Sequence, residues 1–151
     1  MEINVEQGKL AKALGIVSRV AAGSRTTLPI LNNVLIKALD GKVKLVTTNL
    51  DMAIVSYLGV ANSKDGEITV PARLLADFVS NLPKGEIKMT ASDSKLTVSS
   101  GKYKSSFNGA PAEDFPELPD ISEAEAVIYR MNIEAFKTGI NEVKIACSSD
   151  T

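Results

Sequence analysis

The sequence contains no histidine and no tryptophan, and it has one cysteine among 151 residues. Without histidine, a Ser-His-Asp triad, a His-ligated zinc site and histidine acid–base catalysis are all excluded. The single cysteine, Cys147, excludes an internal disulfide and suits a reducing compartment. Aromatic residues make up only 5% of the chain, which argues against a nucleic-acid surface built mainly on base stacking.

The sequence also lacks any run near the ~20 apolar residues that a membrane helix needs. Its first residues, MEINVEQ, have neither a basic leader nor an apolar signal region. We therefore expect a cytoplasmic protein that makes no membrane contact. The formal net charge is -1, so bulk charge predicts no nucleic-acid partner, and such a prediction must rest on where the basic residues lie.

What the sequence does contain is alternating and helical apolar patterning that predicts an α+β fold. Val34, Ile36 and Ala38 share one face of a strand, because successive side chains alternate. Asp40-Gly41 is typical of a two-residue hairpin turn, since glycine tolerates positive φ. Residues 62–66 are predicted as a polar turn. Further strands are predicted at residues 3–5, 43–45, 53–60, 67–70, 87–91 and 96–100, with an extension of the last through 103–107 left open.

A first helix is predicted from Gln7 to Ala22. Its apolar residues recur at helical spacing and should form a buried stripe: Leu10, Ala13, Leu14, Val17 and Ala21. Lys9, Lys12 and Arg19 cluster on the opposite side, and no acidic residue follows Glu6 in this helix. The first helix therefore combines an apolar side with a basic side.

A second helix is predicted to begin at Pro71, because proline is favoured at the first helical position. Arg73 and Asp77 should point outward, and the helix should end before Pro83. The buried stripe is predicted to be Leu74, Leu75, Phe78 and Leu82.

Residues 110–125 hold three prolines and six acidic residues with no basic one, which is typical of an interdomain connector. The segment that follows repeats the N-terminal pattern after a shift of 126 positions. Tyr129 and Met131 fall on strand residues 3 and 5, while Phe136, Ile140, Val143 and Cys147 fall on the stripe of the first helix. A fixed-period repeat indicates a repeated structural unit. We predict a complete first domain at residues 1–120 and a truncated second domain at residues 121–151, in a fragment of a longer protein.

Four short motifs resemble the first domain of the bacterial sliding clamp, the beta subunit of DNA polymerase III. They occur in the order Thr27-Leu28-Pro29-Ile30-Leu31, Thr48-Asn49-Leu50-Asp51-Met52, Val70-Pro71-Ala72-Arg73-Leu74 and Ala112-Glu113-Asp114-Phe115-Pro116. The resemblance implies the DNA-clamp fold, in which each domain packs two antiparallel sheets on two helices. It also implies a homodimeric ring that encircles double-stranded DNA without sequence preference, tethers the catalytic subunit of DNA polymerase III, has no catalytic activity and needs no cofactor. The groove that binds the polymerase and the clamp loader would lie mostly outside these residues.

The resemblance assigns two sets of residues. The helices would line the channel, with DNA bound by Arg25, Arg73, Lys12, Lys9 and Arg19, because such cations neutralise phosphates whatever the base sequence. The subunit interface would use the edge strand that carries Lys102, Tyr103, Lys104, Ser105 and Phe107. Ser105 departs from the family, where this position is often apolar or aromatic.

The residues alone leave other interpretations open. The basic helix side could be an ordinary solvated face, Arg25 a plain loop residue, and Arg73 the i,i+4 ion-pair partner of Asp77. Cys147 falls on an apolar stripe and is more typical of a core residue than of a nucleophile. The aspartates lie separately in turns, so no metal site is predicted. The alternative functions are an α+β protein–protein adaptor without a DNA function and, with less support, a carboxylate-dependent hydrolase or nuclease.

Overall fold

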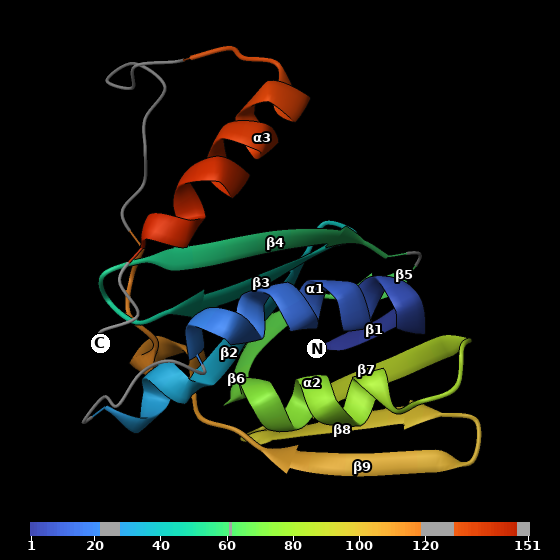
Figure 1. The fold of residues 1–151 in the computed structure, drawn as a ribbon. Coiled ribbons are helices and arrows are strands. Elements are labelled where there is room, and N and C mark those ends of the chain that lie inside the picture. The colour runs from blue at the N-terminus through green and yellow to red at the C-terminus, as the bar shows by residue number, and fades with distance from the viewer. Residues whose placement is uncertain (22–27, 61, 119–128, 148–151) are drawn as a thin grey trace. The chain divides into compact units, whose positions relative to one another are not determined.

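The computed structural model describes residues 1–21, 28–60, 62–118 and 129–147 (Figure 1). The chain divides into two compact units, Met1–Leu118 and Pro119–Thr151. Two statements stay predictions: residues 1–120 form a complete domain, and residues 121–151 begin a second one.

The first unit is built from two antiparallel sheets, as predicted. The five-stranded sheet has the order β5-β1-β7-β8-β9, formed by β5 (Asn62–Lys64), β1 (Glu2–Glu6), β7 (Glu86–Ser92), β8 (Lys95–Ser100) and β9 (Tyr103–Asn108). The four-stranded sheet has the order β4-β3-β2-β6, formed by β4 (Ala53–Gly59), β3 (Lys42–Thr48), β2 (Asn33–Leu39) and β6 (Gly66–Pro71). Two short 3-10 helices flank them, η1 (Pro29–Asn32) and η2 (Ala112–Asp114).

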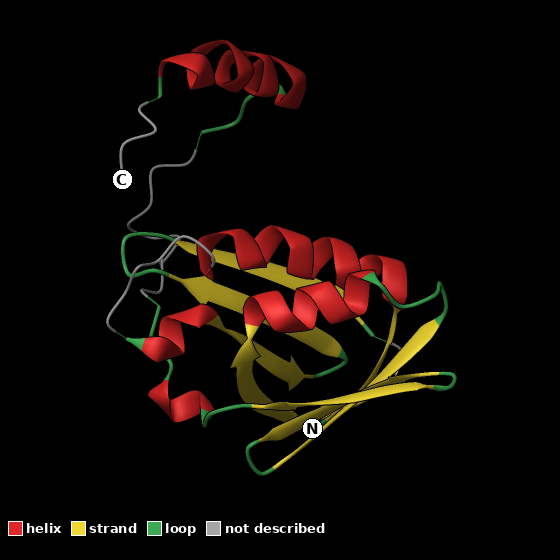
Figure 2. Ribbon diagram, turned by 60° about the horizontal axis from the view of Figure 1, so that its bottom comes forward, coloured by secondary structure: helices red, strands yellow, loops and turns green. Residues whose placement is uncertain are grey.

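Two helices, α1 (Gln7–Ala21) and α2 (Ala72–Ser80), pack against each other and cover one side of the sheets (Figure 2). The predicted stripe of α1 is confirmed, because Leu10, Leu14 and Val17 are fully buried and Ala13 and Ala21 nearly so. These side chains meet the inward faces of both sheets and form a single core.

The predicted stripe of α2 is partly wrong. Leu75 and Leu82 are buried, but Leu74 is 58% exposed, and its place is taken by Ala72 and Val79. The buried positions 72, 75 and 79 follow i, i+3 and i+7 spacing, whereas residue 74 lies about 100° around the helix from residue 75. Leu74 therefore belongs to the outward side of α2.

The strand predictions for the first unit need two corrections. Residues 62–64, predicted as part of a polar turn, form the edge strand β5, which pairs with β1. Residues 103–108 are not an extension of β8 but a separate strand, β9, because Gly101 adopts φ 56° and reverses the chain. The hairpin turn at Asp40-Gly41 is confirmed, with both residues at positive φ.

Buried polar side chains fix the helices to their surroundings at two points. The Thr47 hydroxyl, from β3, donates a 2.6 Å hydrogen bond to the carbonyl of Val17 in α1. The side-chain amide of Gln7 donates to the carbonyl of Val79 at 2.9 Å, and the Gln7 backbone N–H donates to the carbonyl of Gly85 at 2.8 Å. The start of α1 is thus bonded to both the end of α2 and the segment that follows it.

Glu2 joins three strands of the five-stranded sheet through its carboxylate. Lys88 of β7 and Lys64 of β5 approach it to 2.5 Å and 3.2 Å. Hydrogen bonds from Lys88, and then from Lys64, lower the pKa of the Glu2 carboxyl below its usual value.

A carboxyl whose pKa is lowered on folding stabilises the fold above its unfolded pKa, and this contribution is lost as the pH falls through the folded pKa. The variant Glu2→Gln should therefore melt at a lower temperature than the parent chain near neutral pH. The two melting curves should converge on acidification below about pH 4. Thermal melts monitored by circular dichroism across this pH range test the prediction. A difference independent of pH would contradict it.

In the second unit, residues 129–132 adopt no regular structure, so the predicted strand at 129–131 is wrong among the described residues. Helix α3 (Ile133–Val143) is present, and the Asn132 side chain caps it by accepting from the N–H groups of residues 134 and 135. A 3-10 turn, η3 (Lys144–Ala146), follows. The predicted buried stripe is exposed, with Phe136 at 51%, Ile140 at 48% and Val143 at 65%. Cys147 is also exposed. Within residues 129–147 the short turn η3 is the sole other element, and it is too small to cover the apolar side of α3.

Candidate nucleic-acid interface

The outward side of α1 and α2, here called the helix face, carries four of the five predicted DNA-binding residues. Lys9, Lys12 and Arg19 are exposed on α1, with Ile16 between them at 42% exposure. Positions 9, 12, 16 and 19 follow i, i+3, i+7 and i+10 spacing, so the core stripe on the other side of the helix forces them outward. Arg73 is exposed on α2, which lies beside α1. The fold thus brings basic residues from two helices to one surface.

The helix face carries little negative charge. Helix α1 contains no acidic residue, and the sole acidic residue of α2 is Asp77. The i,i+4 ion pair between Arg73 and Asp77, which the sequence left open, is not formed among the described side chains. The guanidinium of Arg73 is consequently available to an external anion.

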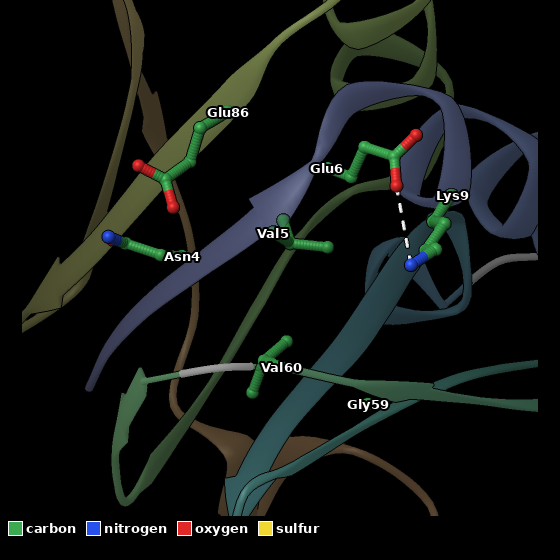
Figure 3. A pocket seen from close by; sticks show the side chains of 7 residues that line it. All are labelled: Asn4, Val5, Glu6, Lys9, Gly59, Val60 and Glu86. Atoms are coloured by element: carbon green, nitrogen blue, oxygen red, sulfur yellow. Dashed lines mark ion pairs between the residues drawn. The ribbon is translucent and has the colours of Figure 1, made fainter.

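Lys9 is in a different position from the other cations of the face. Its ammonium lies 3.3 Å from the carboxylate of Glu6, and both side chains are mostly exposed. Figure 3 shows Lys9 reaching back to Glu6 at the end of β1. The pair was not predicted from the sequence, because Glu6 ends β1 and Lys9 lies in α1, so helical spacing does not relate the two residues. Within the described ranges, Lys12, Arg19 and Arg73 form no ion pair.

A cavity of about 240 Å³ lies beside this ion pair (Figure 3). Its acidic side chains are Glu6, which faces Lys9, and Glu86, which lies beside Asn4. Across residues 1–21, 28–60, 62–118 and 129–147, no group of three or more cysteine or acidic side chains could hold a metal ion. Among the described residues that line the cavity, none is a serine, threonine or cysteine that could act as a nucleophile.

Two further predictions concern Arg25 and the edge strand β9. Arg25 lies outside the described residues. On β9, Tyr103 is 45% exposed, with the ammonium of Lys102 5.5 Å from its ring centre, and Lys104 is exposed. Phe107 is only 4% exposed and packs edge-on against Phe78 with ring centres 5.6 Å apart, so its side chain belongs to the core.

Ser105 is half-buried on β9. The strand pairs with β8 on one side and is the last strand of its sheet, so its other edge has no partner strand in the part of the chain that the structure describes. In the same part of the chain, no helix is long and apolar enough to span a membrane.

The fold and the basic helix face together define a protein of the sliding-clamp class. A solved structure described as pol III beta from Caulobacter crescentus superposes with a TM-score of 0.87 at 29% identity, covering 99% of this chain and 40% of that one. The family model for the DNA polymerase III beta subunit, N-terminal domain, matches residues 1–119. The chain belongs to the DNA polymerase III beta subunit family.

Curated relatives agree with this assignment. The beta sliding clamp of Synechocystis is 34% identical over 161 aligned positions that include 99% of this chain, and that of Escherichia coli K12 is 38% identical over 122 positions that include 80% of it. The chain spans 40% of the length of the first relative and 33% of the second.

Proposed function

We propose that this chain supplies part of the wall of a sliding clamp that encircles duplex DNA and tethers the replicative DNA polymerase. The observation that carries the proposal is the helix face, where Lys12, Arg19 and Arg73 are exposed and form no ion pair with any described residue. Membership of the DNA polymerase III beta subunit family supports the same function.

The cations of the helix face suit a protein that must slide along the phosphate backbone of DNA. Lysine and arginine side chains on helices neutralise phosphates without distinguishing bases, and the binding that results weakens with salt. Arg25 is proposed to add a further phosphate contact. Lys9 is proposed to contribute less than the other cations, because Glu6 already neutralises it.

The remaining parts of the function follow from the family. The clamp is proposed to be a homodimer. Its subunit interface would use Lys102, in the turn before β9, together with Tyr103, Lys104, Ser105 and the backbone of Phe107 on β9. The catalytic subunit of DNA polymerase III and the clamp loader are proposed to bind in a groove mostly outside this chain. The protein would act in the cytoplasm, where bacterial DNA is replicated, and would catalyse no reaction of its own.

A topological experiment tests this function. The protein, expressed from its complete gene, is loaded onto nicked circular DNA by its clamp loader and separated from free protein by gel filtration. A clamp should remain on the circle and dissociate when a restriction enzyme linearises it, because a ring slides off a free end. An adaptor without a DNA function would show no retention on either form. Retention that survives linearisation would contradict encirclement.

A further inference from the structure

Helix α1 is held in different ways at its two ends. The first turn is bonded through Gln7 to the end of α2. The last turns pack on β3 and β4 (Figure 1), and their buried residues after Leu14 are the smaller Val17, Val20 and Ala21. Apolar contacts are non-directional, so packing of such small side chains leaves the rotation of these turns weakly fixed. A directional bond would add what this packing lacks.

The hydroxyl of Thr47 supplies such a bond. It lies 2.6 Å from the carbonyl oxygen of Val17, and both residues are fully buried. Thr47 belongs to β3, which pairs with β2 on one side and with β4 on the other. Its branched side chain is stiff at χ1. The hydrogen bond therefore joins the last turns of α1 to a fixed point of the sheet.

The anchored carbonyl lies across the helix from a cation of the helix face. Arg19 follows Val17 by two residues, which is about 200° around an α-helix and about 3 Å along its axis. A rotation of these turns would therefore move the Arg19 guanidinium across the helix face. Gly15 lies between Lys12 and Arg19 and weakens the helix there, so the orientation at Arg19 does not simply follow that at Lys12.

We infer that Thr47 is a positioning residue for DNA binding: its hydroxyl holds the last turns of α1 in the orientation at which Arg19 reaches the phosphate backbone. This role rests on the proposed function and adds to it a buried residue that touches no DNA. The variant Thr47→Val removes the hydroxyl and keeps the shape of the side chain. The carbonyl of Val17 keeps a partner, because it also accepts the helical N–H of Ala21. The fold should therefore tolerate the change.

The test measures the affinity for a labelled duplex against salt by fluorescence anisotropy, with the protein from its complete gene. Thr47→Val should lower the slope of log affinity against log salt toward that of Arg19→Gln. The affinity should fall at least about threefold near 0.1 M salt, because one phosphate contact of each protomer is weakened. In the Arg19→Gln background the same change should have no further effect, whereas in the Lys12→Gln background it should have its full effect.

Two control variants make the result specific. Thr47→Ser keeps the hydroxyl and should keep the parent slope. Thr48→Val removes the neighbouring threonine hydroxyl of β3, which donates to the carbonyl of Met52 instead of to α1, and it should also keep the parent slope.

Three results would overturn the positioning role. They are a slope and an affinity unchanged in Thr47→Val, a loss as large in the Arg19→Gln background as in the parent chain, and a chain that unfolds without the hydroxyl, since the bond would then serve the fold. A parent chain whose affinity does not depend on salt would overturn the proposed function as well. The two failures can therefore be told apart.

Discussion

Replacing Gly109 with alanine should strongly destabilise the first unit. An added Cβ would lie 2.2 Å from the carbonyl oxygen of Thr69 and 3.1 Å from Ile68, and Thr69 is fully buried. The backbone cannot simply move away, because Thr69 and Ala110 exchange two hydrogen bonds of 3.0 and 3.2 Å. We expect a loss of about 3 kcal/mol in the free energy of unfolding and a fall of about 10 °C in melting temperature.

Gly15→Ala provides the matched control for this prediction. The glycine lies within α1, and an added Cβ there meets no atom within 4 Å. Alanine should therefore stabilise the helix by up to about 1 kcal/mol. Thermal melts of both variants followed by circular dichroism decide the matter. If Gly109→Ala has the same melting temperature as the parent chain, the prediction is wrong, and residue 109 is then farther from β6 than the structure shows.

Removing the three unpaired cations of the helix face should nearly abolish equilibrium DNA binding. In the triple variant Lys12→Gln, Arg19→Gln and Arg73→Gln, three phosphate contacts are lost from each protomer. Because each contact contributes about 0.9 to the slope of log affinity against log salt, the slope should fall by about 2.7 for each protomer whose helix face contacts the duplex. The affinity itself should fall at least about 10²-fold near 0.1 M salt. Fluorescence anisotropy of a labelled duplex, measured with the protein from its complete gene, gives both quantities.

The control for this experiment removes the same charge from the sheets. Lys42, Lys64 and Lys95 are exposed on three different strands, and replacing all three with glutamine changes the net charge as much as the helix-face variant does. This control should keep the parent salt slope. If both triple variants lose affinity equally, bulk charge rather than the helix face governs binding.

The sequence predicted the part of the site that depends on helical spacing. In α1, large apolar residues mark one side so completely that the opposite side, with Lys12 and Arg19, could be assigned without a structure. Periodicity could not show that Lys9 pairs with Glu6, because the pair forms at the junction between β1 and α1, where strand spacing changes to helical spacing. Arg73 was correctly predicted to point outward. Whether it forms an ion pair with Asp77 depends on side-chain conformations, which residue spacing does not determine.

The errors in the fold have a common physical cause. In α2 the prediction followed the largest apolar residues and so included Leu74, whereas the buried side is marked partly by Ala72, whose small side chain gives a weak signal. Similarly, β5 consists of the polar residues Asn62, Ser63 and Lys64, and what makes it a strand is its pairing with β1 rather than its own composition. Both features are set by neighbours distant in the sequence.

The two bonds of Gln7 have a consequence for how the helix face is lost. Its side chain holds the carbonyl of Val79 at the end of α2, and its backbone holds Gly85 just beyond. Fraying of α2 from that end therefore breaks a buried contact of the first turn of α1. In a native-state fluctuation the two helices should open together as one cooperative unit. The cations on α1 and those on α2 would then be lost or restored to DNA together. A partly opened state that keeps the cations of one helix alone is not expected.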